Sequence, residues 1–292
     1  MIINQAALAG IGRGFKTIFN QAFQGGQPQW PIVAMQAPSD GSEEDYKWLG
    51  AFPKMREWIG ERQVKNLSAF TYTIKNKPFE STISVDRDDI EDDKIGVYTP
   101  LIQGLAHEAA THPDELVFAL LKSGFAATCF DGQYFFDTDH DMGGTSVSNF
   151  GGGTGTPWYL LDLSRPIKPL VFQIRRKPQF VEMDDPKSEN VFRRKEFLYG
   201  VDDRKNVGFG LWQLAYGSKQ ELTPENYAAA RAAMMSLKTE EDKPLGITPT
   251  HLVVPPTLES AGRKILKNSQ LAGGATNEWF ETAELLNVSW LA

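Results

Sequence analysis

The chain has 292 residues, of which 41% are hydrophobic and 23% are charged, so it can bury a substantial core in one large domain or two ordinary ones. The formal net charge of -7 favours solubility and argues against a surface made mainly to bind nucleic acid. The single cysteine, Cys129, excludes an internal disulfide framework and a zinc site built from several cysteines. The sequence shows neither a run of ~18 apolar residues, the length of a membrane helix, nor a signal-peptide pattern. We therefore expect a soluble protein made in a reducing cytoplasm.

The first 22 residues carry apolar side chains near helical spacing, and a Gly/Gln/Pro-rich stretch, QGGQPQWP, follows them. This pattern predicts a short amphipathic helix and then an irregular tether. An aromatic patch, YKWLGAFPKMREWIG, comes next.

From residue 69, apolar and polar residues alternate, first in AFTYTIK and then, after Asn76-Lys77-Pro78, in FESTISV. Alternation on both sides of a turn predicts a β-hairpin. If its first strand begins near Arg62, the arm is about 45 Å long at ~3.3 Å per residue. An isolated hairpin of this length is marginally stable in water, so its own domain or a neighbouring subunit has to cover it.

The acidic block DRDDIEDDK precedes Thr99-Pro100, which predicts the N-cap and first turn of a helix. Carboxylates are favourable there because they lie near the positive end of the helix dipole. Apolar positions keep a helical register to about Lys122, a rod of about 36 Å if unbroken. Pro113 lies inside this register, so we expect a kink there, or a restart with Thr111 or His112 as the new cap.

The segment from Phe125 to about Gly217 reads mostly as strands and turns. The last quarter has α/β character. Thr223-Pro224 opens a helix over ENYAAARAAMMSL, THLVVPP reads as a short buried strand, and TLESAGRKILKN reads as the helix after it.

Residues 137–148 resemble a calcium loop, because Asp137, Asp139 and Asp141 occupy its first three ligand positions. Met142 stands where the sharp turn needs glycine, and Ser148 stands where the loop needs a bidentate carboxylate. The favoured interpretation is therefore a solvated turn that closes a strand.

The sequence HEAATH at residues 107–112 resembles the zinc-protease box. That box needs histidines four residues apart, and here they are five apart, so they cannot share one ion from a regular helix. Two glycine-rich stretches, GIGRGFKT and GGGTGTPW, lack the residues of a phosphate-binding loop.

Cys129 lies in an apolar setting and reads as an inert small hydrophobe. Two basic triplets, Arg175–Lys177 and Arg193–Lys195, could form a phosphate-binding patch if their strands pair. Otherwise they are solvated residues or partners of the acidic block.

From the residues alone, we identify no catalytic, cofactor-binding or metal-binding constellation, and the sequence predicts that the protein is not an enzyme. What remains is an α+β body with a tether, a long hairpin and a long helix. A monomer has little use for so much extended structure, so the pattern indicates a protein that assembles.

Several long motifs carry a family resemblance, and they occur in this order: WLGAFPKMREWIG, YTIKNKPFESTISVDRDDIEDDKIGVYTPL, HPDELVFALL, FDTDH, RKEFLYGVDDRKNVGFGLWQLAYGS and GITPTHLVVPPTLESA. From about Ala34 to the C-terminus the chain resembles the major head (major capsid) proteins of Mu-like phages and prophages. The resemblance implies the α+β fold of tailed-phage major capsid proteins (Hong Kong 97 phage type). That fold has an N-terminal arm, an extended loop, a peripheral domain with a spine helix, and an axial domain.

On this resemblance we expect an arm at residues 1–40, an extended-loop hairpin at 41–87, a peripheral domain at 88–219 with the spine helix at 88–123, and an axial domain at 220–292. The extended loop would reach over a neighbouring subunit, which would provide the cover that the hairpin needs. The residues expected to contact that neighbour are Trp48, Trp58, Tyr72, Lys75, Asn76, Lys77 and Phe79.

The resemblance also implies a structural protein that self-assembles into hexamers and pentamers of an icosahedral head shell around phage double-stranded DNA. It would be assembled in the host cytoplasm and located in the virion, without a cofactor, a membrane or specific DNA contacts. Fewer than 45 residues precede the extended loop, which leaves no room for a fused scaffolding domain, so we expect a separate scaffolding protein. A portal and a decoration protein are further expected partners.

Two other functions stay open at this point. The first is an encapsulin-like nanocompartment shell of the same fold, and the second is a metal-dependent hydrolase built on YFFDTDHDMGG.

Overall fold

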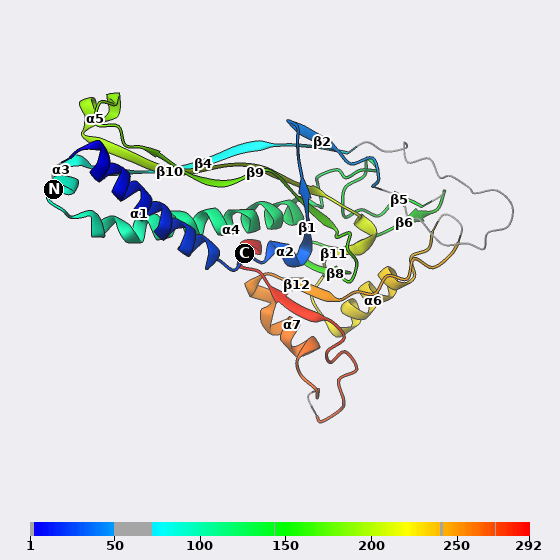
Figure 1. Cartoon of the computed structure of the whole chain (residues 1–292). Helices are drawn as coiled ribbons and strands as arrows, with labels where there is room; N and C mark the ends of the chain where they lie inside the picture. Colours follow the sequence, from blue (N-terminus) through cyan, green and yellow to red (C-terminus); the bar gives the residue numbers. More distant parts are fainter. Residues whose placement is uncertain (1–2, 50–71, 143, 240–241, 272) are drawn as a thin grey trace.

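The computed structural model describes residues 3–49, 72–142, 144–239, 242–271 and 273–292. These residues form two large sheets with helices packed on them and two small two-stranded sheets, β2-β3 and β5-β6 (Figure 1). The helices are α1 (Gln5–Gln24), α2 (Trp30–Val33), α3 (Arg87–Glu91), α4 (Thr99–Ser123), α5 (Glu189–Arg194), α6 (Pro224–Met235) and α7 (Glu259–Leu266), with short 3-10 helices η1 (Ile95–Tyr98), η2 (Trp212–Leu214), η3 (Pro256–Leu258) and η4 (Ser289–Leu291). The strands are β1 (Ala34–Pro38), β2 (Glu43–Asp45), β3 (Thr73–Lys75), β4 (Lys77–Asp86), β5 (His140–Asp141), β6 (Ser146–Val147), β7 (Phe150–Gly153), β8 (Trp158–Leu161), β9 (Leu170–Met183), β10 (Glu196–Phe209), β11 (Ala215–Lys219), β12 (His251–Val254) and β13 (Glu284–Asn287).

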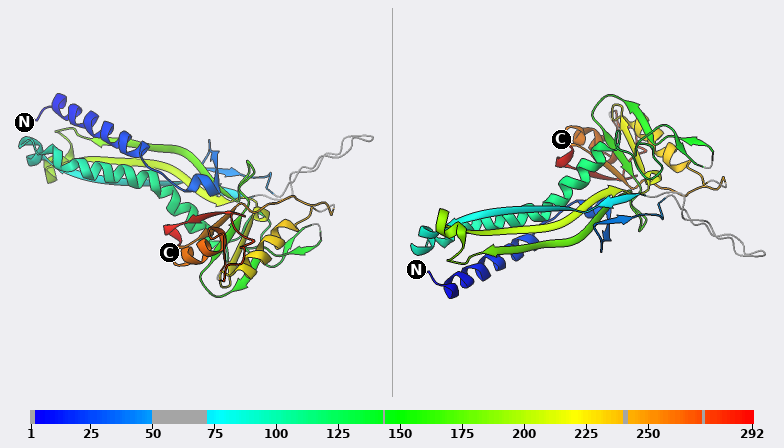
Figure 2. Two further views of the ribbon diagram at one scale, coloured as in Figure 1. Left: turned by 90° about the horizontal axis from the view of Figure 1, so that it is seen from below. Right: turned by 90° about the horizontal axis from the view of Figure 1, so that it is seen from above.

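A long four-stranded sheet of order β1-β9-β10-β4 forms one body, which we call the peripheral body. Strands β9 and β10 have 14 residues each and pair in antiparallel fashion, so this body is about 46 Å long at ~3.3 Å per residue. Helices α1 and α4 lie along the sheet (Figure 2). The predicted amphipathic helix is confirmed as α1, which buries Leu8, Ile11, Phe15 and Phe19 against α4 and the sheet.

The predicted hairpin is wrong in its pairing. Strand β4 pairs along its whole length with β10, from Lys77 opposite Lys205 to Asp86 opposite Glu196. The short β3 pairs instead with β2, so within the described residues β3 and β4 turn away from each other at Asn76. The alternating pattern in FESTISV correctly predicted a half-covered strand, but alternation does not specify the partner. Residues 62–71 of the expected arm lie outside the described part of the chain.

The long helix α4 begins at Thr99, one residue before the predicted start, because Tyr98 and not Thr99 is its N-cap. It runs to Ser123 without a restart at Pro113. The expected spine helix at 88–123 is therefore too long, because α3 and η1 are separate turns before it. Pro113 and Asp114 are buried, and the carboxylate of Asp114 accepts hydrogen bonds from the backbone N–H groups of Gln29 at 3.0 Å and Trp30 at 2.6 Å. Tertiary contacts at this turn therefore stabilise helix that the proline alone would interrupt.

A second, compact body surrounds a five-stranded sheet of order β13-β12-β8-β11-β7. Helices α6 and α7 pack against it, and all three predicted elements of the last quarter are confirmed as α6, β12 and α7. Thr223 caps α6, because its side chain accepts a hydrogen bond from the N–H of Asn226. The domain boundary expected at 219/220 divides this sheet, since β7, β8 and β11 precede it and β12 and β13 follow it.

The buried apolar residues form two clusters. The larger cluster fills the compact body, with Trp158, Tyr159 and Trp212 among its members, and it continues into the near end of the long sheet through Phe172 and Phe209. The smaller cluster lies between α1, α4 and the far part of the long sheet. None of the helices in the described part of the chain is both long and apolar enough to cross a membrane.

Candidate functional site

The acidic stretch at 137–141 is a bend that leads into β5, so the predicted solvated turn is correct only in part, because His140 is buried. The carboxylate of Asp137 accepts hydrogen bonds from the N–H groups of Tyr134 at 3.1 Å and Thr138 at 2.8 Å. The carboxylate of Asp141 accepts from the N–H of Gly144 at 2.7 Å. These two carboxylates satisfy the backbone of their own turn, which is the behaviour expected of Asp in loops.

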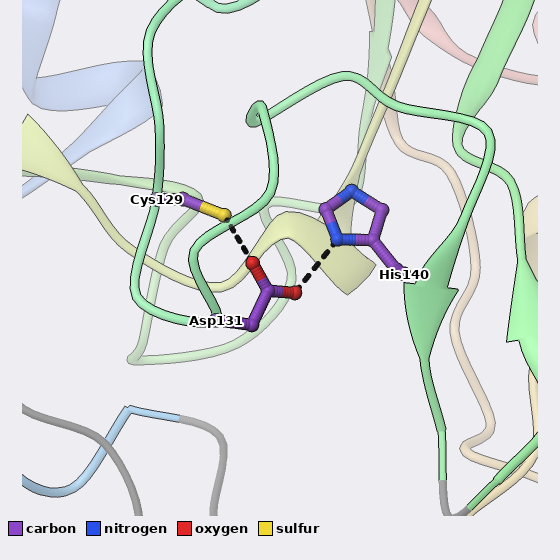
Figure 3. A group of neighbouring side chains, drawn as sticks. All are labelled: Cys129, Asp131 and His140. Carbon is purple, nitrogen blue, oxygen red and sulfur yellow. Dashed lines mark hydrogen bonds and ion pairs between the residues drawn. The ribbon is translucent and has the colours of Figure 1, made fainter.

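His140 points inward and joins a cluster that the sequence did not predict (Figure 3). Its Nδ1 lies 2.7 Å from Oδ2 of Asp131, and the thiol of Cys129 donates to Oδ1 of the same carboxylate at 3.1 Å. The imidazole stacks on Trp212 with ring centroids 3.9 Å apart. Among the described residues, Cys129, Asp131 and His140 have ligand-type atoms within 4.8 Å of one another.

The charges and pKa shifts of Cys129, Asp131 and His140 favour a structural hydrogen-bond network over a reactive or metal-binding centre. Burial, with the charge of Asp131, raises the pKa of the Cys129 thiol, which opposes the thiolate that a nucleophile or a metal ligand requires. Burial alone would raise the pKa of Asp131, but hydrogen bonds from His140 and Cys129 outweigh it and lower the pKa. The carboxylate is therefore the charged acceptor that ties residues 129–140 together.

The histidines of HEAATH do not meet either. Both lie on α4, where His107 is exposed and His112 is half-buried with its ring edge to face against Phe79, centroids 4.6 Å apart. The prediction that these two residues do not share an ion agrees with this placement.

The residues expected to contact a neighbouring subunit have different environments. Lys75 and Lys77 are exposed, and Lys75 forms an ion pair with Glu43 at 3.7 Å. Trp48 packs edge to face on Tyr46 at 6.0 Å. The hydroxyl of Tyr72 accepts a hydrogen bond from the N–H of Phe209 at 3.0 Å. Trp58 lies outside the described residues.

Asn76 is buried, and its side chain is used inside the subunit. Its amide donates to Oγ of Ser39 at 2.7 Å and to the carbonyl of Gly41 at 3.0 Å, while its oxygen accepts from Gln173 at 2.9 Å. Gln173 in turn accepts from the hydroxyl of Tyr46, which keeps its proton because burial raises the pKa of Tyr46 to about 12. The side chain of Asn76 is therefore used within the subunit, and its contact with a neighbour stays a prediction.

The two basic triplets do not form one patch, although β9 and β10 pair. Arg176 lies in the middle of β9 and binds Asp202 at 2.7 Å, whereas the second triplet lies in and just after α5 at the far end of the peripheral body. Met183 lies seven positions along β9 from Arg176, which is about 23 Å at ~3.3 Å per residue. The alternative prediction is confirmed at one position, because Lys195 pairs with Asp88 of the acidic block at 3.3 Å.

The far end of the peripheral body exposes a group of large apolar side chains, which we call the apolar tip. Phe192 of α5 is 89% exposed, the highest value among the large apolar residues described. The other members are Val97, Leu101, Val181 and Met183. Phe180 and Glu182 of β9 face α1, so Val181 and Met183 lie on the other face of the sheet, and the apolar tip exposes apolar side chains on more than one face. Exposed apolar side chains are candidates for contact with a neighbour, and the sequence did not reveal this one, because Phe192 reads as one apolar residue in a polar turn.

This arrangement resembles proteins of phage heads. The family model of the Mu-like prophage major head subunit gpT matches residues 8–291. The chain is 39% identical over 287 residues to the major capsid protein of Escherichia phage Mu, covering 94% of both chains. It is 41% identical over 295 residues to the Mu-like prophage FluMu major head subunit of Haemophilus influenzae, covering 96% of this chain and 94% of the relative.

Solved structures agree with these relatives. The structure is similar to a chain of the bacteriophage JBD30 procapsid, with a TM-score of 0.88 and 45% identity over 99% of this chain and 100% of that chain. For the JBD30 capsid the TM-score is 0.78, with 36% identity over 90% of this chain and 91% of that chain. The same values hold for a JBD30 capsid decorated with minor capsid protein trimers.

Fold and relatives together define a structural shell protein with the tailed-phage capsid fold. The chain belongs to the Mu-like prophage major head subunit family.

Proposed function

We propose that many identical copies of this chain assemble as hexamers and pentamers into the closed icosahedral shell of a phage head, which encloses double-stranded DNA. The observation that carries the proposal is the likeness to a procapsid subunit over 99% of the chain at a TM-score of 0.88. Closed shells of identical subunits need several distinct contact surfaces on each copy. The apolar tip and the exposed lysines beside β3 and β4 supply two candidates.

We assign the parts of the subunit from the sheets. The peripheral domain comprises the long sheet with α4 and α1, and the axial domain comprises the five-stranded sheet with α6 and α7. On this assignment β7, β8 and β11 belong to the axial domain. Exposed residues of the predicted contact set, led by Lys75 and Lys77, remain candidates for contact with the next subunit.

The expected partners are other copies of the chain, a separate scaffolding protein, a portal and a decoration protein. The decoration protein has support in a relative, since a JBD30 capsid carries minor capsid protein trimers. The net charge of -7 supports a shell whose contacts with packaged DNA are non-specific and weak. Assembly would take place in the host cytoplasm, and no catalytic step is required of this chain.

The two other functions are less well supported. The hydrolase depends on the stretch YFFDTDHDMGG, in which the carboxylates of Asp137 and Asp141 accept hydrogen bonds from nearby backbone N–H groups. The nanocompartment shares the fold, but family membership over residues 8–291 favours a phage head.

The test is to express the full chain with the scaffolding protein of its own phage and to separate the products by sedimentation. We expect fast-sedimenting shells that are visible by electron microscopy. Phe192→Ser should reduce the fraction of protein in shells at least tenfold, whereas Tyr134→Ser, which removes an exposed aromatic ring from the compact body, serves as the matched control. Monomers alone, with scaffold present, would contradict the proposal.

A further inference from the structure

Strands β2 and β3 form a two-stranded sheet of three residue pairs, which lies over β9 and β10. Phe172 of β9 packs on Trp30 of α2 with ring centroids 4.3 Å apart. The next residue, Gln173, therefore points to the opposite face of the long sheet, where β2 and β3 lie. A two-stranded sheet of this length is not stable by itself, so its contacts with the long sheet decide where it lies.

One part of these contacts is a close approach between β3 and β10. Ile74 is 3% exposed and lies against Gly208, where any side chain would collide with it. Next to this contact, the amide of Asn206 donates to the carbonyl of Lys75 at 2.7 Å. Apolar packing is non-directional. These contacts hold β3 on the long sheet, but β2 could still turn about β3.

Gln173 holds both strands of the small sheet. It is fully buried, and its Oε1 accepts a hydrogen bond from the hydroxyl of Tyr46, just after β2, at 2.8 Å. Its Nε2 donates to the carbonyl of Ile74 in β3 at 3.0 Å and to Oδ1 of Asn76 at 2.9 Å. The carbonyl oxygen and both N–H groups of this one amide are therefore used, and they reach both strands.

Further hydrogen bonds tie the turn before β2 to the same network. Asn76 donates to Oγ of Ser39 at 2.7 Å and to the carbonyl of Gly41 at 3.0 Å. Oε1 of Glu44 accepts from that hydroxyl at 2.9 Å, from the N–H of Asp40 at 2.7 Å and from the N–H of Gly41 at 3.0 Å. The backbone hydrogen bonds from Gly41 and Asp40 lower the pKa of Glu44, so the acceptor is charged at pH 7. The turn, β2 and β3 thus form one hydrogen-bonded unit that meets β9 at Gln173.

This network gives the small sheet one direction relative to the long sheet. Hydrogen bonds have a preferred angle as well as a preferred length. A buried amide that loses its partners costs about 1–3 kcal/mol per unsatisfied group. Rotation of β2 and β3 on the long sheet would break several of these bonds together, so the network opposes it.

We propose that Gln173 is a positioning residue for assembly: it fixes the direction in which β2 and β3 leave the long sheet, and so places their exposed residues against a second copy of the chain. Among these residues are Lys75 and Glu43, whose side chains are 78% and 48% exposed. The inference rests on the proposed function. It gives a role to a buried residue that neither the family likeness nor the expected contact set includes.

The first test measures the direction of the small sheet in unassembled subunits. Spin labels are attached to Ser42→Cys, just before β2, and to Ser84→Cys on β4, both at exposed positions, and the native Cys129 is buried. Ser84 lies seven positions along β4 from Lys77, about 23 Å at ~3.3 Å per residue, a range suited to pulsed electron paramagnetic resonance. We expect a narrow distance distribution in the original chain and one at least twice as wide in Gln173→Leu.

The second test measures assembly of the same variants with the scaffolding protein, at a temperature below their thermal unfolding. The yield of shells should fall at least tenfold in Gln173→Leu. The matched control is Gln213→Leu, the same substitution at a glutamine of the compact body that is 3% exposed. This control should leave both the distance distribution and the yield of shells unchanged.

A milder variant covers the case in which Gln173→Leu does not fold. Tyr46→Phe removes one hydroxyl, and with it one of the three hydrogen bonds of the Gln173 amide. We expect its distance distribution to be wider than that of the original chain, and its yield of shells to fall at least threefold.

Each remaining outcome contradicts a stated part. If the distribution stays narrow in folded Gln173→Leu and in Tyr46→Phe, Gln173 does not set the direction, while the proposed function stands. A wide distribution with a normal yield of shells would show that assembly does not need this direction. An equal loss of shells in Gln213→Leu would assign the effect to core stability and overturn the inference. If the original chain forms no shells, the proposed function fails and the inference falls with it.

Discussion

The two bodies of the subunit are built differently, although they belong to one chain. The compact body surrounds its sheet with α6, α7 and loops, and its core contains the largest fully buried side chains, including Trp158 and Trp212. The peripheral body is a thin layer of two helices on a long sheet. One of those helices, α1, contacts the rest of the protein through the one face that carries its buried side chains. Local stability follows the amount of buried apolar surface. The compact body should therefore keep its shape while the peripheral body adapts to its neighbours.

The largest effect is expected in the core of the compact body. Trp158→Ala removes a fully buried indole that also donates to the carbonyl of Gln220 at 2.9 Å. It should lower the free energy of unfolding by about 3–5 kcal/mol, measured by urea denaturation. Trp290→Ala, at a position 41% exposed, is the matched control and should cost less than about 1 kcal/mol. Equal losses would show that the compact body is not the stable part.

Phe15→Ala tests the peripheral body in the same way. Phe15 is buried on α1 and contacts the ring of Tyr199 edge to face at 5.0 Å. The loss in free energy of unfolding should be smaller for Phe15→Ala than for Trp158→Ala. This loss cannot exceed the free energy with which α1 packs on the rest of the protein. Hydrogen exchange of α1 amides should accelerate at least tenfold while exchange in the compact body stays unchanged. Lys16→Ala, on the exposed face, is the control; unchanged exchange in α1 of the Phe15 variant would contradict the comparison.

Asp131→Asn tests the cluster with Cys129 and His140. Loss of the charged acceptor should cost about 1.5–3 kcal/mol at pH 7 by urea denaturation, the value typical of hydrogen bonds to charged groups. Burial alone would raise the pKa of the Asp131 carboxyl, but hydrogen bonds from His140 and Cys129 outweigh it and hold this pKa below its value in the unfolded chain. Its stabilisation is therefore complete above that value and disappears as the pH falls through the lower, folded-state pKa. The Asp131→Asn variant should lack this part of the acid-unfolding transition. If the variant and the original chain have identical acid transitions, the charged Asp131 carboxylate does not stabilise the hydrogen-bond network.

The smallest effects compare two helix caps. Thr223→Ala removes the cap of α6 in the compact body and should cost about 1 kcal/mol in urea denaturation. Ser188→Ala removes the cap of α5, a six-residue helix at the apolar tip, and should cost less, because a short exposed helix frays before the sheet unfolds. Thr223→Ser should restore most of the stability. A larger loss at Ser188 would show that the tip is as rigid as the compact body.

Elements set by local patterns could be predicted from the sequence. Apolar spacing identified α1, α6 and α7, and Thr-Pro pairs marked the starts of α4 and α6. The family could also be recognised from the sequence, because its motifs are long and occur in order. The predicted turn at the acidic stretch was correct in part, since Asp137 and Asp141 have local roles there while His140 is buried.

Features that depend on tertiary contacts could not be predicted in this way. The partner of β4 is β10, more than 100 residues away, and alternation in β4 is equally compatible with a hairpin. The predicted alternative of a helix restart at Pro113 was wrong. Asp114 accepts hydrogen bonds from Gln29 and Trp30, which are far away in the chain, and the sequence does not show these contacts. The cluster at His140 had one usable signal. His140 alternates with Asp139 and Asp141, which places it on the opposite side of the chain from two acids.

The short helix α2 has a consequence for the way the N-terminal segment can move. Its first N–H groups are bound by the buried carboxylate of Asp114, and the ammonium of Lys168 donates to the carbonyls of Pro31 and Ile32 at 2.5 and 2.7 Å. A carboxylate therefore binds the N-terminal end of α2 and an ammonium binds its C-terminal carbonyl groups, and the two charges come from separate parts of the chain. Residues 29–32 are thus held by contacts separate from the buried face of α1, so a substitution that weakens the packing of α1 on the sheet should leave α2 in place.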